Sequence, residues 1–280
     1  MVTALDLSKI SAMKPDTEGV WSVQADDIVS YPEATREAYA RIEERSFWFD
    51  HRNHVLKSII QRFPPPGAIL DVGGGNGFVA LALQDAGFPV TLLEPSRYAC
   101  SIAHARGVRA VGCSTFAGAS FQSRVLPAIG LFDVLEHVED DRAMLREFER
   151  TLAPGGRLYV TVPAFNTLWS DADRYAGHFR RYRRSQLVSL LRETGFDVEF
   201  ASYFFSVLVP GILVLRVGRQ LLGGKLDHDA EDEHRLPRNM IGKIATGLLR
   251  AERRRLAAGR SLPFGSSCAV VARARSDRGA

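Results

Sequence analysis

A glycine-rich loop bordered by an acidic residue is the feature of this sequence best suited to binding a ligand. The run Asp71-Val72-Gly73-Gly74-Gly75-Asn76-Gly77 follows a short apolar segment and precedes a stretch of good helix formers. Glycines at such a turn let the backbone approach a ligand closely, and the helix start adds free N–H groups. The spacing is D-x-G-x-G-x-G, and Phe78 stands where the dinucleotide fingerprint would need a further glycine.

Two carboxylates indicate which ligand the loop would take. Asp71 can meet a ligand ammonium or order the loop, whereas a pyrophosphate would be repelled at this distance. Glu94 ends the next apolar run, and a carboxylate at the end of a strand can accept both hydroxyls of a ribose. The pattern therefore favours a cationic, nucleoside-bearing cofactor over one that carries phosphates.

Two histidines could serve as a general base. His137 begins a predicted helix in Leu135-Glu136-His137-Val138, and its imidazole titrates near neutral pH. His178 lies in a long connection between predicted elements, together with Trp169, Asp171 and Tyr182. Loops on a rigid scaffold carry function disproportionately, so this connection is expected to bind an acceptor or to supply the base. The alternatives are that His137 only orders its turn and that the connection is an ordered lid.

Charged residues near these histidines leave two further questions. The basic run Arg180, Arg181, Arg183 and Arg184 could meet an anionic acceptor, or it could be a solvated face at a helix start. The residues Glu136, His137, Glu139 and Asp140 include metal-ligand types. Because they are nearly consecutive, they should point in different directions, and no metal is expected.

Alternating apolar runs and helical stretches must position these residues. Strands are predicted at 68–72, 89–93, 108–111, 128–132, 157–162, 196–200 and 267–274, and helices at 78–86, 97–106, 141–152 and 184–193. This alternation is typical of an α/β fold with a parallel sheet and helices on both faces.

The chain is expected to divide into four parts. Residues 1–63 form an N-terminal arm, loose over 1–30, and a helical cap that begins at Pro32. Residues 64–200 form the sheet core, with an acceptor loop over 164–183. Residues 201–266 form a helical insertion with helices at 204–222 and 239–256, because a structureless connection of that length is improbable. Residues 267–280 form the last strand and a tail.

Four motifs in order resemble those of the class I S-adenosylmethionine-dependent methyltransferases. They are Ile69 to Gly77 (ILDVGGGNG), Leu93-Glu94-Pro95, Phe132 to Val138 (FDVLEHV) and Leu152 to Leu158 (LAPGGRL). The resemblance implies a Rossmann-like seven-stranded methyltransferase sheet, with the helical cap over the cofactor and the helical insertion before the last strand.

The resemblance also implies which residues hold S-adenosyl-L-methionine. Asp71, Gly73 and Gly75, with the neighbouring Asn76, would line its methionine end, and Glu94, followed by Pro95, would hold the ribose hydroxyls. The cofactor-binding set is completed by Phe132 and Asp133 near the sulfonium, by Trp48 and Arg52 of the cap, with Arg52 on the methionine carboxylate, and by Ser114. Many relatives carry an acidic residue after the third strand, which meets the adenine amino group. In this sequence Ser114 or a backbone carbonyl would make that contact instead.

The expected reaction is an in-line transfer of a methyl group to a small-molecule or lipid-linked acceptor, most simply to oxygen. The cofactor supplies the electrophile, and the protein must position the acceptor and remove the proton of a hydroxyl. The catalytic candidates are His178, His137 and Tyr182, and the acceptor-binding candidates are Trp169, Asp171, Arg180 and Arg181. The alternatives are N- or C-methylation of a soluble natural-product or sugar intermediate, and a non-catalytic partner protein that binds S-adenosylmethionine.

Composition excludes several classes of protein. Lys and Arg exceed Asp and Glu by only 36 to 32, which is too little for a dedicated nucleic-acid binder. The three cysteines are odd in number and widely spaced, so neither a disulfide framework nor a zinc pattern is expected, and a reducing cytoplasm is the simplest location.

An apolar run over 201–215 raises the question of membrane contact. Pro210-Gly211 interrupts it, and it falls short of the roughly 20 residues that a spanning helix needs. The LWS, GHFRRY and LPFGSS segments resemble, more loosely, bacterial methyltransferases found beside polyprenyl-phosphate sugar transferases. That resemblance implies an acceptor near the inner face of the membrane, whereas a homodimer interface or a core extension would explain the run equally well.

Overall fold

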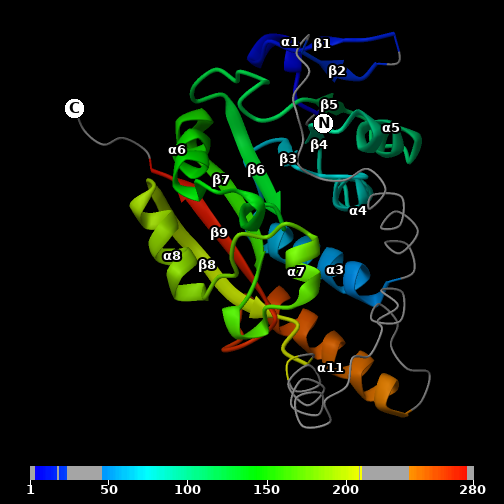
Figure 1. The fold of residues 1–280 in the computed structure, drawn as a ribbon, viewed down its shortest axis with the longest axis vertical. Helices are drawn as coiled ribbons and strands as arrows, with labels where there is room; N and C mark the ends of the chain where they lie inside the picture. Colours follow the sequence, from blue (N-terminus) through cyan, green and yellow to red (C-terminus); the bar gives the residue numbers. More distant parts are fainter. Residues whose placement is uncertain (1–3, 18, 24–45, 208, 210–239, 276–280) are drawn as a thin grey trace.

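The chain builds a mixed nine-stranded sheet with the order β1-β2-β5-β4-β3-β6-β7-β9-β8 (Figure 1). The computed structural model describes residues 4–17, 19–23, 46–207, 209 and 240–275. The strands are β1 (Lys14–Pro15), β2 (Trp21–Ser22), β3 (Ile69–Val72), β4 (Val90–Glu94), β5 (Val111–Cys113), β6 (Leu126–Phe132), β7 (Leu152–Pro163), β8 (Phe196–Phe204) and β9 (Ser267–Ala274).

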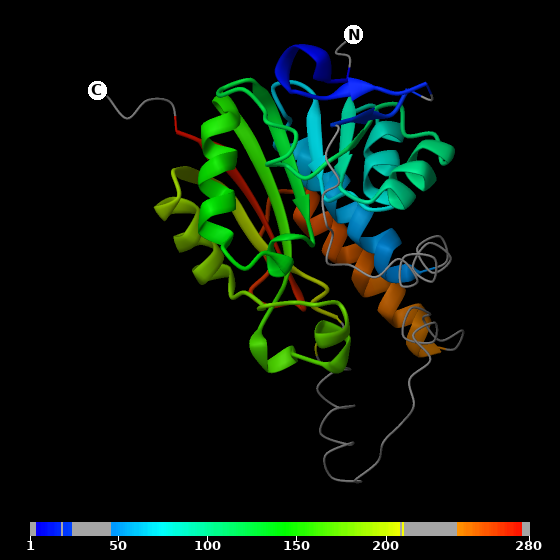
Figure 2. The same ribbon diagram turned by 45° about the horizontal axis from the view of Figure 1, so that its top comes forward.

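Helices pack on both faces of this sheet (Figures 1 and 2). One apolar layer uses buried side chains of α6 (Asp141–Thr151) and α8 (Arg184–Glu193). The opposite layer uses those of α3 (Phe47–Arg62), α4 (Phe78–Asp85), α5 (Arg97–Ala105) and α11 (Met240–Ala257). The short elements are α1 (Leu7–Ile10), α7 (Asp171–Tyr175) and the 3-10 turns η1 (Leu135–His137) and η2 (Asn166–Leu168).

The prediction of an all-parallel sheet is wrong at its C-terminal edge. The strands from β5 to β7 are parallel, but β9 runs antiparallel to both β7 and β8. Parallel strands alternate with helices only as far as β8. The long segment that contains α11 then joins β8 to β9, and β9 enters between β7 and β8 in the opposite direction. Several predicted strands also differ in their bounds, since β5 begins later and β7 and β8 are longer than expected.

Residues 4–17 and 19–23 of the expected loose arm form a short helix and two short strands. β2 pairs with β5, with Trp21 opposite Gly112, and this adds β1 and β2 to the seven expected strands. Leu7 and Met13 are 0% and 2% exposed, and their side chains pack against Gly112, which has no side chain of its own. Their burial explains this structure, which the lack of sequence periodicity did not suggest.

The cap and the insertion are only partly within the described residues. The predicted helix over 239–256 matches α11, and α3 forms the second helix of the expected cap. The helix expected from Pro32 lies outside the described residues, as does most of the helix expected at 204–222, whose first residue instead ends β8. Within the described part of the chain, no helix has the length and apolarity needed to cross a bilayer.

Candidate functional site

The glycine-rich loop leaves β3 at its carboxyl end and enters α4. Gly75 has a φ of 54°, a left-handed conformation that favours glycine, and a Cβ added there would meet no atom within 4 Å. A Cβ at Gly74 would instead lie 2.8 Å from Oδ2 of Asp71. The backbone at Gly75 therefore faces open space, as a surface that receives a ligand should.

Glu94 connects this loop to the end of β4. The carboxylate is 4% exposed, and it accepts hydrogen bonds from the N–H groups of Gly75 at 3.1 Å and Ser96 at 3.0 Å. A carboxylate at the end of a parallel strand can also accept the hydroxyls of a ribose. Glu94 thus shapes the loop and still fits the expected ribose contact.

Asp71 is a buried acidic residue beside the same loop, next to Gly74. It is 1% exposed, and its Oδ2 atom has no hydrogen-bond partner among the described residues. Burial raises the pKa of Asp71 to about 7, against the opposing influence of Arg52 and with a further contribution from Glu94. Burying an unpaired polar group is costly, and a cationic ligand would offset that cost, so the residues fit S-adenosylmethionine.

The residues expected around the adenosine part lie beside Glu94. The N–H of Ser114 donates to the Glu94 carbonyl oxygen at 3.2 Å, and the buried Ser114 hydroxyl has no partner in the described part of the chain. Pro95 is half-buried next to Glu94, and Asn76 is buried in the loop, where its backbone carbonyl accepts from Arg106 at 3.0 Å. This arrangement agrees with a polar adenine contact from Ser114.

Arg52 reaches the site from α3, which begins at the N-cap Ser46. Its Nη1 atom lies 2.8 Å from Oδ2 of Asp133, and its guanidinium stands 5.0 Å from the ring centres of both Trp48 and Phe49. The Nε atom is buried without a partner among the described residues. Arg52 therefore binds Asp133 through Nη1, while its Nε–H is available to the expected methionine carboxylate.

Asp133 follows the buried Phe132 at the end of β6. Its backbone has a φ of 58°, and its Oδ1 atom accepts a hydrogen bond from Thr161 of β7 at 3.1 Å. A non-glycine residue in this region is uncommon and often marks a functional site. Thr161 was not predicted, and only its place on the neighbouring strand could have suggested it.

Beyond Asp133, the structure brings His137 and His178 together. The ring centres lie 4.6 Å apart with their planes at 83°, although the residues come from separate segments. His178 pairs through Nδ1 with Oδ1 of Asp173 at 2.8 Å. Burial, reinforced by His178, lowers the pKa of His137 to about 4, so His137 is neutral at physiological pH.

Two buried carboxyl groups accompany the histidines. Burial alone would raise the pKa of Asp173, but hydrogen bonds from His178 and Arg181 outweigh it and hold that pKa well below its usual range. Glu136 is 1% exposed, and burial together with Asp133 raises its pKa well above its usual range. Sequence reasoning missed Asp173, although the Ser170–Asp173 capping box is a signal that could have marked it.

Several predicted residues of the 164–183 connection bind other parts of the protein. The Tyr182 hydroxyl donates to Asp141 at 2.8 Å, and burial with this bond raises the Tyr182 pKa well above its usual range. Arg180 also binds Asp141, at 2.9 Å, and Arg181 holds Asp173 at 2.7 and 2.9 Å. These contacts indicate that the three side chains position the connection.

The other two acceptor candidates, Trp169 and Asp171, lie in the same connection and differ in exposure. The Asp171 side chain is 96% exposed and pairs with Arg174 on α7. Trp169 is half-buried between η2 and α7.

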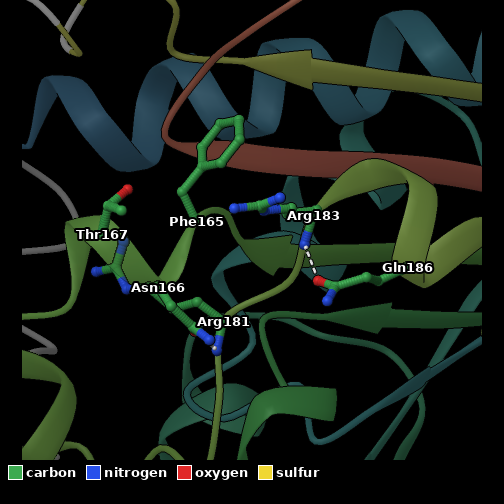
Figure 3. A pocket seen from close by; sticks show the side chains of 6 residues that line it. All are labelled: Phe165, Asn166, Thr167, Arg181, Arg183 and Gln186. Atoms are coloured by element: carbon green, nitrogen blue, oxygen red, sulfur yellow. Dashed lines mark hydrogen bonds between the residues drawn. The ribbon is translucent and has the colours of Figure 1, made fainter.

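A polar cavity of about 150 Å³ lies beside this connection. Figure 3 shows the Arg183 side chain extending toward Phe165, while Gln186 turns back to accept the Arg183 N–H at 2.9 Å. Asn166 accepts the N–H of Arg181 at 3.1 Å. The cavity is lined by Phe165, Asn166, Thr167, Arg181, Arg183 and Gln186, and its two arginines suit an anionic group.

Comparisons with known proteins agree with this geometry. Residues 48–200 match a family model described as a methyltransferase domain. A probable S-adenosylmethionine-dependent methyltransferase of Mycolicibacterium smegmatis is 26% identical over 161 residues, which are 56% of this chain and 62% of that protein. A ubiquinone biosynthesis O-methyltransferase of Xanthomonas axonopodis is 26% identical over 167 residues, covering 52% of this chain and 70% of the relative.

Solved structures show the same fold. Phosphoethanolamine N-methyltransferase 2 of Haemonchus contortus, in complex with S-adenosyl-L-methionine, superposes with a TM-score of 0.55 at 16% identity, over 91% of this chain and 61% of that one. A structure of the Trm112 methyltransferase activator of Haloferax volcanii with a methyltransferase gives a TM-score of 0.57 at 16% identity, over 89% and 97%. At this identity the likeness concerns the fold alone.

Proposed function

The chain belongs to the class I S-adenosylmethionine-dependent methyltransferases, and we propose that it methylates an oxygen atom of a small-molecule or lipid-linked acceptor. S-adenosyl-L-methionine supplies the activated methyl group. Asp71, the backbone at Gly75 and Glu94 would hold this cofactor, because they lie together at the carboxyl ends of β3 and β4 and the backbone of Gly75 faces open space. The chain matches 62% of the length of the Mycolicibacterium smegmatis relative.

The observation that carries the choice of oxygen is the pairing of His178 with Asp173 at 2.8 Å. A carboxylate on Nδ1 favours the tautomer that carries its proton there, and this leaves the Nε2 lone pair as a base. As the acceptor oxygen bonds to the methyl carbon, the carbon–sulfur bond breaks and the acceptor proton passes to Nε2 of His178. His137 beside it is neutral and can hydrogen-bond to the same hydroxyl.

Two further observations support this acceptor. One relative is a ubiquinone biosynthesis O-methyltransferase, which transfers to oxygen. The cavity between Phe165 and Arg183 lies in the same connection as His178 and would take an anionic group of the acceptor, such as a carboxylate or a phosphate. Arg183 would contact that group, while Arg180, Arg181 and Tyr182 position the connection.

The test is a labelling experiment. The purified chain is incubated with methyl-labelled S-adenosylmethionine and an extract of the source organism, and the label is followed into the organic and aqueous phases. Label in an organic product indicates a lipid-linked acceptor, and label in an aqueous product indicates a soluble one. Transfer should be lost in His178→Ala and kept in His104→Ala, whose histidine is exposed on α5. Equal transfer by both variants would contradict the role of His178.

A further inference from the structure

Three potential metal ligands converge at the edge of the candidate site. Glu136, His137 and His178 each offer one ligand atom, and these atoms all lie within 4.8 Å of one another. Glu136 and His137 belong to η1 after β6, whereas His178 follows α7. From this convergence we infer that the three side chains form a binding site for a divalent transition metal of the Zn²⁺ class.

Each histidine is oriented by a neighbouring group. His178 uses Nδ1 for the buried Asp173, so its Nε2 atom is directed elsewhere. His137 interacts with the backbone of Ala176. Metal-binding histidines in proteins almost always bind a carboxylate or a backbone carbonyl through their second nitrogen, which fixes the ring orientation.

Glu136 completes the set with a buried oxygen. The residue is 1% exposed, and its Oε2 atom has no hydrogen-bond partner among the residues that the structure describes. A metal ion would compensate the cost of burying that oxygen. The Glu136 backbone carbonyl accepts the Phe179 N–H at 2.8 Å, so the two segments that supply the ligands are joined directly.

The ligand types select the metal. Two imidazoles and one carboxylate suit Zn²⁺, Co²⁺ or Ni²⁺, whereas Mg²⁺ and Ca²⁺ prefer oxygen ligands. Zinc bonds of about 2.1 Å place tetrahedral ligand atoms about 3.4 Å apart, so the side chains would need to close by on the order of 1 Å. From the sequence we expected no metal, because Glu136, His137, Glu139 and Asp140 are nearly consecutive and should point in different directions. That expectation did not consider His178, which is distant along the chain.

Metal binding and the proposed base role exclude each other. The lone pair on Nε2 of His178 can either coordinate a metal or accept a proton. The effect on turnover therefore rests on the proposed function, whereas the binding site does not. We expect the metal-loaded enzyme to be inactive and a chelator to restore its turnover.

The test of the site uses Co²⁺ as a spectroscopic probe on the full chain after treatment with a chelator. One Co²⁺ per chain should bind and give visible d–d bands, and Zn²⁺ should displace it. His178→Ala and Glu136→Gln should abolish the bands, Asp173→Asn should weaken binding about 10–100-fold, and His104→Ala should change nothing. Calorimetric titration with S-adenosylmethionine verifies that each variant is folded.

The outcomes separate the two proposals. No saturable Co²⁺ binding, or equal binding by His178→Ala and the wild type, would overturn the metal site and leave the proposed function intact. Stoichiometric binding with inhibition by Zn²⁺ supports both. Binding with activation by Zn²⁺ would uphold the metal site and overturn the role of His178 as a base.

Discussion

Nδ1 of His178 lies 2.8 Å from Oδ1 of Asp173, a carboxylate that is 1% exposed and also binds Arg181. The pair joins the segment after α7, which contains His178, to α7, which contains Asp173. Since Asp173 takes up Nδ1, the orientation of the imidazole is set before an acceptor arrives. This arrangement is the basis for assigning proton removal to His178.

His178→Ala should abolish turnover while the affinity for S-adenosylmethionine stays within about threefold, or roughly 0.7 kcal/mol. The reason is that His178 contacts Asp173 and His137, which lie outside the glycine loop. Steady-state rates and calorimetry on the same preparation measure the two quantities. A parallel loss of cofactor affinity would show that His178 supports the fold of the cofactor site.

Glu94→Ala should weaken S-adenosylmethionine binding by at least about 1–3 kcal/mol, the range for lost hydrogen bonds to a charged group. The variant also frees the N–H of Gly75, so the loop itself is expected to loosen. The control is Glu193→Ala, which removes a half-exposed glutamate that pairs with Arg142 on the surface. Calorimetric affinities that agree between Glu94→Ala and the wild type would remove the ribose assignment.

Gly75→Ala should block the cofactor without unfolding the chain. The added methyl group meets no protein atom within 4 Å and therefore projects into the space assigned to the ligand. Gly87→Ala is a matched control, because Gly87 also has a positive φ, of 89°, and open space at Cβ, but lies after α4. Thermal unfolding should shift by similar amounts in both variants, whereas only Gly75→Ala should lose calorimetric binding. Equal affinities would place the cofactor elsewhere.

Binding of S-adenosylmethionine should weaken as the pH falls below about 7. The pKa of Asp71 is raised to about 7, so the carboxylate that favours a cation is present above this value and becomes protonated below it. Calorimetry from pH 5.5 to 8.5 in buffers of different ionisation enthalpy should reveal proton release on binding near neutral pH. Asp71→Asn should remove this dependence. A flat profile in the wild type would show that Asp71 does not meet the cation.

Glu252→Ala should destabilise the fold by about 3 kcal/mol or more, because several buried donors would lose their acceptor, each at a cost of about 1–3 kcal/mol. The side chains of Glu252 and His51 are 2% and 0% exposed and lie 2.8 Å apart, joining α11 to α3. Glu252 also accepts the backbone N–H groups of Phe205 at 2.6 Å and Ser206 at 2.9 Å. Chemical denaturation measures the change. A loss below 1 kcal/mol, similar to that of Glu193→Ala, would mean that the network contributes little.

Local patterns were enough to predict the core of this fold. The glycine loop, the strand that ends at Glu94 and the helix over 239–256 appear close to where apolar periodicity and turn residues placed them. The direction of β9 depends on how a long excursion returns to the sheet. The structure of residues 4–17 and 19–23 depends on burial of Leu7 and Met13 beside Gly112. Neither the direction of β9 nor the burial of Leu7 and Met13 can be recognised in a local sequence pattern.

The candidate site shows the same division between local and distant information. The spacing of the motifs was enough to predict that Asp71, Gly75 and Glu94 lie at the same edge of the sheet. It could not show that Tyr182 and Arg180 both bind Asp141, because that pairing spans about 40 residues and depends on the packed connection. For the same reason, the meeting of His137 with His178 became visible only in the folded structure.

A crystal structure with S-adenosylhomocysteine bound would test the central claim most directly. The account predicts that the ribose hydroxyls contact Glu94, that the ligand passes over Gly75, and that its sulfur faces the side where His137 and His178 meet. A ligand bound away from Gly75, or a ribose with no contact to Glu94, would contradict the assignment of the cofactor site.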